Sequence, residues 1–78
     1  MGSAFLGRPV IASDRRLKED IHRVGTLDNG LPVYAYRYVW GGPVQIGIMA
    51  DEARQIHPDA VHEDASGFMA VDYGQAVQ

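Results

Sequence analysis

Residues 13 to 21, "SDRRLKEDI", hold a serine and a lysine whose side chains could do chemistry together. A serine hydroxyl is a weak nucleophile at neutral pH and needs a base to take its proton. A lysine can be that base only when burial or a neighbouring cation disfavours its charged form. Ser13 and Lys18 could therefore be a nucleophile and its general base, provided that Lys18 is shielded from water.

The same two residues also have a purely structural interpretation. Ser13 could be a turn or cap residue, and Lys18 could be a solvated charge. The nearby carboxylates Asp14 and Asp20 could orient Lys18 or the chain around Ser13, or could simply be solvated. The residue types and their spacing leave both interpretations open.

Two further residues are candidates for a supporting role. Arg16 could pair with an acidic residue such as Glu52. We also expect the carbonyl under attack to need hydrogen-bond donors for its oxyanion, with backbone amides as the expected source.

The composition limits the partners that the chain could have. Its 78 residues make one small domain without cysteine, so disulfides and thiolate zinc sites are excluded and association is the expected support for a small core. The net charge of -3 comes without a basic cluster, so we expect no nucleic acid and no anionic membrane as partner. No apolar run approaches the roughly 20 residues of a membrane span, and the start "MGSAFLGRPV" lacks the order of a signal peptide. We expect a soluble product of a reducing cytoplasm.

Two turn signals predict a β-hairpin. Asp28-Asn29-Gly30 and Gly41-Gly42-Pro43 bound a predicted strand over residues 32 to 40. Its alternation places Val33, Ala35, Arg37 and Val39 on one face and Tyr34, Tyr36, Tyr38 and Trp40 on the other. A second strand is predicted over residues 16 to 24, with Leu17, Glu19 and Ile21 opposite Lys18, Asp20 and His22. The aromatic face could be a base-stacking platform, but the charge balance favours packing.

The rest of the chain predicts a short helix and one more strand. Residues 49 to 57 contain good helix formers that end at Pro58, and a strand is predicted over residues 67 to 73 after the polar loop "HEDASG". No further element is expected after it, and Met49, Phe68 and Met69 are expected in the core. The predicted class is α+β, mostly β: a small hairpin-based sheet with one short helix.

A metal site is the weaker hypothesis for the acidic and histidine-rich segment "HPDAVHED". His57, Asp59, His62, Glu63 and Asp64 are ligand types, but Pro58 breaks the helical face that paired ligands would use. We therefore interpret these residues as surface and expect neither a metal nor a cofactor.

Three segments resemble a known family. "SDRRLKEDI", "GIMADEARQIHPDAV" and "GFMAVDY" occur in this order in the intramolecular chaperone domain of phage tail fibres and tailspikes, the peptidase S74 domain of endosialidase type. The first motif is the more specific one, and it matches at Ser13, Asp14, Arg16, Leu17, Lys18, Asp20 and Ile21. The second motif matches at Gly47, Ile48, Ala50, Glu52 and Pro58.

The resemblance implies a function for the serine and the lysine. Such a domain lies at the C-terminal end of a fibrous protein, helps the β-rich shaft before it to form a homotrimer, and then cuts itself off. The cut would fall between Ala12 and Ser13, with Ser13 as nucleophile and Lys18 as base, which makes the chain a single-turnover self-cleaving serine endopeptidase. Its partners would be its own copies and the upstream segment of the same chain.

The resemblance also implies domain limits and a location. The chaperone domain would span residues 12–78, and residues 1–11 would be a linker or the end of the upstream shaft. Independently of the resemblance, the tripeptide of residues 1–3 is typical of an expression remnant. The protein would belong to a virion tail fibre or tailspike that is made and assembled in the host cytoplasm. Because a long amine on so small a chain should reach water, we expect a subunit interface to bury Lys18, so that cleavage waits for assembly.

Two alternatives stay open. The same fold could remain attached to the fibre tip as an uncleaved trimerisation cap. It could also be a tip that binds the host surface.

Overall fold

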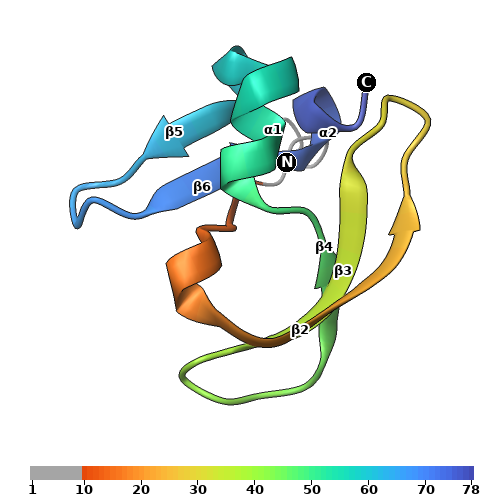
Figure 1. The fold of residues 1–78 in the computed structure, drawn as a ribbon. Helices are drawn as coiled ribbons and strands as arrows, with labels where there is room; N and C mark the ends of the chain where they lie inside the picture. Colours follow the sequence, from red (N-terminus) through yellow and green to blue (C-terminus); the bar gives the residue numbers. More distant parts are fainter. Residues whose placement is uncertain (1–9) are drawn as a thin grey trace, which may run out of the picture.

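The computed structural model describes residues 10–78, which form two antiparallel three-stranded sheets (Figure 1). The first sheet has the order β1 (Val10–Ala12), β6 (Met69–Asp72), β5 (Val61–Glu63). The second has the order β2 (Lys18–Thr26), β3 (Pro32–Tyr38), β4 (Gln45–Gly47). The predicted mostly-β class is confirmed, but the strands are divided between two sheets instead of one.

The predicted hairpin is confirmed as β2 and β3, the long orange and yellow strands of Figure 1. The Leu27 amide donates to the Leu31 carbonyl at 2.8 Å, and the Asn29 side chain accepts from the Leu31 amide at 3.0 Å. Gly30 has a φ of 95°, which glycine adopts without strain. The turn chemistry of Asp28-Asn29-Gly30 therefore closes the hairpin as the sequence predicts.

The predicted alternation along β2 is wrong. The register shifts between Glu19 and His22, so that Asp20 and Ile21 lie opposite Tyr36 alone, and Asp20 has a φ of 52°. An extra residue in one strand of a pair is a β-bulge. Beyond the bulge, the alternation of side chains between the two faces of the sheet is shifted by one residue. Lys18 is consequently buried while Asp20, predicted on the same face, is exposed.

The predicted helix is confirmed as α1 (Ala50–Ile56), and a 3-10 turn, η3 (Pro58–Ala60), follows it at the expected proline. The predicted last strand is confirmed as β6, but the expectation that nothing follows it is wrong. A second short helix, α2 (Tyr73–Ala76), begins there because the Asp72 side chain accepts a hydrogen bond from the Gln75 amide at 3.3 Å. None of the helices within residues 10–78 is long and apolar enough to cross a membrane.

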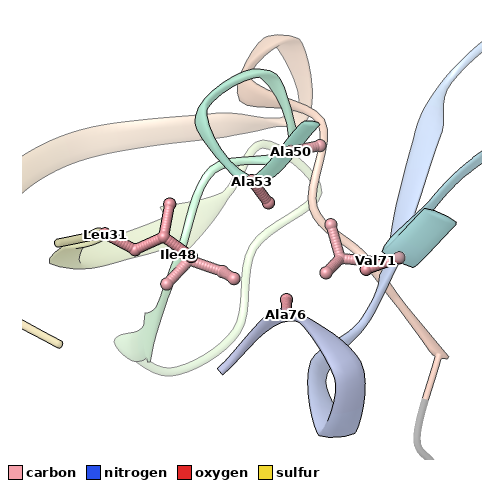
Figure 2. Packing of buried hydrophobic residues seen from close by; sticks show 7 residues of the cluster. Leu31, Ile48, Ala50, Ala53, Val71 and Ala76 are labelled. Carbon is pink, nitrogen blue, oxygen red and sulfur yellow. The ribbon is translucent and has the colours of Figure 1, made fainter. Parts of the chain in front are cut away.

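The core lies where α1 and α2 pack on the first sheet beside the end of the hairpin (Figure 2). Leu31 and Ile48 meet at one end, and the rest of the buried cluster is Ala50, Ala53, Ala60, Val71 and Ala76. Four of these residues are alanines, so the short helices approach the sheet closely. Met49 is fully buried as predicted. Phe68 and Met69 are half-buried, and Met69 packs against the core cluster.

The predicted linker falls mostly on residues 1–9, outside the described residues. Its last two residues, Val10 and Ile11, are paired with Asp72 and Val71 in the first sheet. The boundary between residues 11 and 12 stays a prediction.

Candidate active site

A tight turn brings the two predicted catalytic residues together. Ser13 directly follows β1, Lys18 begins β2, and the 3-10 turn η2 (Arg15–Leu17) connects them. The Ser13 amide donates to the Met69 carbonyl at 3.1 Å, and the Ser13 carbonyl accepts from the Ala50 amide at 3.0 Å. Ser13 is therefore fixed between β6 and the start of α1, and the turn returns the chain so that Lys18 faces it.

Lys18 Nζ lies 2.9 Å from Ser13 Oγ, within hydrogen-bond distance. Both side chains also contact one backbone oxygen: Ser13 Oγ donates to the Ile48 carbonyl at 2.6 Å, and Lys18 Nζ donates to it at 2.9 Å. Ser13 is fully buried and Lys18 is 6% exposed. The structure thus brings the predicted nucleophile and base into contact, and their catalytic roles stay a prediction.

A single chain already shields the Lys18 amine, so the expectation that only a subunit interface could do so is wrong. The amine lies over the face of the Tyr36 ring, 3.9 Å from its centroid, and against the Ile48 carbonyl. Burial, and after it the positive charge of Arg15, lower the pKa of Lys18 to about 8. At neutral pH an appreciable fraction of this amine is uncharged and able to accept a proton.

The peptide bond before Ser13 is held by hydrogen bonds at both of its polar atoms. The Ala12 carbonyl accepts a hydrogen bond from the Tyr38 hydroxyl at 2.6 Å, and the Ser13 amide is bonded to Met69 as described above. The donor at this carbonyl is a side chain, where the sequence predicted backbone amides.

A second tyrosine hydroxyl supports the serine from the other side. Tyr73 Oη lies 3.1 Å from Ser13 Oγ and accepts a hydrogen bond from the Ile48 amide at 3.1 Å. Gly47 leaves room for it, since a methyl group at Gly47 would collide with the Tyr73 hydroxyl. The sequence analysis missed Tyr38 and Tyr73 because it assigned the aromatic side chains to packing. The only signal for Tyr38 was its place on the aromatic face of the strand predicted over residues 32 to 40.

Asp14 binds its own turn and does not contact Lys18. Its buried carboxylate accepts from the Arg16 amide at 2.9 Å, from Arg16 Nη2 at 2.8 Å and from the Met69 amide at 3.0 Å. The hydrogen bonds from Arg16 hold the pKa of Asp14 well below its usual range. Asp14 therefore locks the turn onto β6 and positions Ser13 indirectly.

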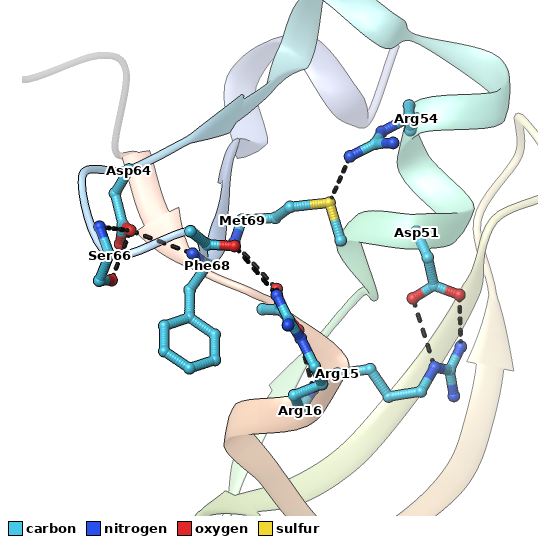
Figure 3. Close-up of polar contacts among 10 residues, drawn as sticks. Arg15, Arg16, Asp51, Arg54, Asp64, Ser66, Phe68 and Met69 are labelled. Atoms are coloured by element: carbon cyan, nitrogen blue, oxygen red, sulfur yellow. Dashed lines mark hydrogen bonds and ion pairs between the residues drawn. The ribbon is translucent and has the colours of Figure 1, made fainter.

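Arg16 pairs with an acidic residue as predicted, but this residue is Asp14 and not Glu52, which lies beside the neighbouring Arg15. Arg15 Nη2 lies 3.0 Å from Asp51 Oδ2 and 3.6 Å from Glu52 Oε2, and Figure 3 shows its guanidinium facing Asp51 on α1. The partner of Arg16 is Asp14, as described above. The 3-10 turn points the two consecutive arginines in different directions, which the spacing alone did not reveal.

Asp20 lies away from the serine and the lysine, so its predicted orienting role is not supported by the geometry. Its carboxylate is exposed and lies 3.9 Å from Arg37 Nη1. The bulge at this position turns the side chain outward.

The candidate metal ligands are dispersed along the surface. Asp64 accepts hydrogen bonds from the backbone of Ser66 and Phe68 and so closes the β5–β6 loop (Figure 3). Among residues 10–78 no group of three or more histidine and acidic side chains could hold a metal ion.

Comparison with protein families gives a match that covers this site. Residues 13–62, more than half of the 78 residues, match the family described as "Peptidase_S74: Chaperone of endosialidase". The matched segment begins at Ser13 and contains Lys18, Tyr36, Tyr38 and the Ile48 carbonyl. No curated protein and no solved structure gave a match. The chain belongs to the chaperone-of-endosialidase family, Peptidase_S74, and this membership supports a chaperone role.

Proposed function

We propose that this chain is a C-terminal intramolecular chaperone that promotes trimerisation and folding of a phage tail fibre or tailspike and releases itself by cutting between Ala12 and Ser13. Family membership supports the chaperone role. The observation that carries self-cleavage is the 2.9 Å contact between Lys18 Nζ and Ser13 Oγ in a buried site next to this peptide bond.

The chemistry proceeds in two steps. Neutral Lys18 takes the proton of Ser13 Oγ while this oxygen attacks the Ala12 carbonyl carbon. The bond between this carbon and the Ser13 nitrogen breaks, the nitrogen takes the proton back from Lys18, and an ester joins Ala12 to Ser13 Oγ. Water then adds to the ester, and its proton passes through Lys18 to Ser13 Oγ as the ester bond breaks. The products are an Ala12 carboxylate and a chain that begins with the free amine of Ser13.

The resting hydrogen bonds explain why cleavage depends on the protonation of Lys18. A charged Lys18 donates to both Ser13 Oγ and the Ile48 carbonyl, and it has no lone pair for the serine proton. A neutral Lys18 can accept this proton at the same distance. The lowered pKa of about 8 makes the neutral form accessible near physiological pH.

Exposed apolar side chains in the β3–β4 connection and on β4 support the homotrimer. Val39 is 51% exposed, Trp40 62% and Val44 55% in the connection, and Ile46 is 62% exposed on β4. A small monomer seldom leaves several large apolar side chains in water on one segment unless another surface covers them. We propose that copies of the chain pack through this segment, and light scattering at micromolar concentration should give the mass of a trimer. A folded monomer would contradict this part of the proposal.

The test of self-cleavage is a set of variants carrying native upstream sequence, followed by intact-mass spectrometry. Ser13→Ala removes the nucleophile, and Lys18→Arg keeps a positive charge on a group that cannot become a base. Both should abolish cutting while the oligomer is retained, although the buried, permanently charged guanidinium of Lys18→Arg should lower the melting temperature. Glu19→Gln, at an exposed neighbour, should cut like the parent. Lys18→Arg cutting at the parental rate would reject Lys18 as the base. A parent that stays whole but trimeric would favour the uncleaved cap.

A further inference from the structure

The Ala12 carbonyl is the reacting carbonyl of the proposed cleavage, and its single hydrogen bond from a side chain calls for an explanation. In antiparallel pairs, residues alternate between those that exchange backbone hydrogen bonds and those that do not. The Ser13 amide donates to Met69, so residues 13 and 69 are in the bonded register. Ala12, opposite Ala70, is one residue away and therefore in the non-bonded register.

This register turns the Ala12 carbonyl away from β6. β1 is an edge strand, with β6 on one side and no strand of residues 10–78 on the other. The second sheet supplies a donor there: Tyr38 Oη lies 2.6 Å from the Ala12 oxygen. A hydroxyl of the hairpin thus reaches the one polar atom of this peptide bond that the first sheet leaves unbonded.

We propose that Tyr38 is a catalytic residue, whose hydroxyl donates the hydrogen bond that stabilises the oxyanion formed on the Ala12 oxygen during self-cleavage. This inference rests on the proposed function. As Ser13 Oγ attacks, the carbonyl electron pair moves onto this oxygen, and its negative charge strengthens the hydrogen bond from Tyr38. The same oxygen becomes negative again when water attacks the ester, so Tyr38 assists both steps.

The Tyr38 ring is held in place by a stacking contact and by an edge contact. It stacks on Trp40 with centroids 4.4 Å apart and an angle of 7° between the rings, and it meets Tyr36 edge to face at 5.4 Å. These contacts hold the hydroxyl before the reaction, so no reorganisation is needed when charge develops. They belong to the ring and not to the hydroxyl, so Tyr38→Phe keeps them.

The experiment compares cleavage rates of the full chain with native upstream sequence, measured by intact mass on folded, size-selected protein between pH 6 and pH 9. Tyr38→Phe should slow cleavage by about 10²- to 10³-fold, as expected for loss of one oxyanion donor. The pH at which the rate is half-maximal should stay that of the parent, because Lys18 is untouched. The matched control is Tyr34→Phe, which removes a hydroxyl on the same strand that donates to Glu52 at 3.0 Å. Because the Tyr34 hydroxyl does not contact the Ala12 oxygen, this variant should cut within about twofold of the parent.

A second variant separates the hydroxyl from its ring contacts. Trp40→Leu removes the stacking partner and keeps the Tyr38 hydroxyl. Because Trp40 also belongs to the proposed subunit contact, the rate of this variant is measured on the size-selected trimer, where the loss should be much smaller than that of Tyr38→Phe. An equal loss in both variants would overturn the proposal, as would a Tyr38→Phe protein that cuts like the parent or differs only in its pH midpoint. If the parent itself does not cut, self-cleavage fails, and Tyr38 has no oxyanion to stabilise.

Discussion

Lys18 Nζ lies 3.9 Å from the centroid of the Tyr36 ring, and this contact has two opposite effects on the amine. The ring face attracts the ammonium form, but the ring also excludes water and so disfavours charge. Burial is the largest cause of the lowered pKa of Lys18, about 8. Tyr36, only 3% exposed, thus links the packing of the hairpin to the state of the proposed base.

Replacing Tyr36 with alanine should therefore damage both stability and cleavage. Truncation of a well-packed aromatic ring costs about 3–5 kcal/mol, so we expect Tyr36→Ala to unfold or to dissociate the assembly. Where it remains folded, water reaches Lys18 and the pH needed for cleavage rises. Thermal melting and native mass in an uncleavable Ser13→Ala background measure the loss of stability, and the pH profile of cleavage is measured with Ser13 intact. Unchanged melting and mass would show that the ring is not part of the core.

Cleavage should accelerate with pH. The folded-state pKa of Lys18 is lowered to about 8, so the neutral base is scarce at pH 6 and dominant above pH 9. The rate should rise about tenfold per pH unit below the midpoint and level off above it. Single-turnover time courses followed by mass spectrometry give this profile. A rate independent of pH from 6 to 9 would argue against a neutral lysine as base.

Two charged side chains near the turn should shift the pH midpoint of cleavage in opposite directions. Arg15 lowers the pKa of Lys18 and Asp51 raises it, although the two side chains pair with each other at 3.0 Å. Arg15→Gln should therefore slow cleavage at pH 7 and Asp51→Asn should accelerate it, each by about two- to fivefold because both groups are partly exposed. Both effects should shrink at high salt. Arg23→Gln, on the exposed hairpin, should leave the rate unchanged.

Gly47 should be intolerant of any side chain. A methyl group there would collide with the Tyr73 hydroxyl and lie 3.1 Å from the Tyr36 hydroxyl, two groups that line the Ser13–Lys18 site. We expect Gly47→Ala to cost about 1–3 kcal/mol of stability and to slow cleavage by displacing Tyr73 from Ser13. Gly25→Ala on β2 is the control, because nothing lies within 4 Å of the added carbon. Equal behaviour of the two variants would show that Tyr73 does not position the serine.

The hairpin, α1 and β6 were predictable because each has its own local signal. Gly30 and its neighbours define the turn, Pro58 ends the helix, and the aromatic and β-branched run of β3 favours a strand. The strands β1, β4 and β5 are only three residues long, too short for a period, and they exist because longer segments pair with them. The helix α2 depends on one cap at Asp72.

The sequence predicted the two central residues of the site, but it did not predict the side chains and backbone groups that surround them. The motif identified Ser13 and Lys18, but the bulge at Asp20 and the burial of Lys18 within one chain depend on how the hairpin folds over the turn. The Ile48 carbonyl could not be found at all, since every residue has one. Arg15 and Arg16 are adjacent and chemically alike, so only the 3-10 turn decides which reaches Asp51 and which binds Asp14.

The most direct measurement of the central claim is the intact mass of both fragments after the parent chain, with native upstream sequence, is incubated at pH 8. We predict a C-terminal fragment of residues 13–78 that begins with the free amine of Ser13, and an upstream fragment that ends at Ala12. With hydroxylamine present, the upstream fragment should instead carry a hydroxamate at Ala12, because an ester to Ser13 is its precursor. A chain that remains whole, or fragments that meet at any other bond, would contradict the account.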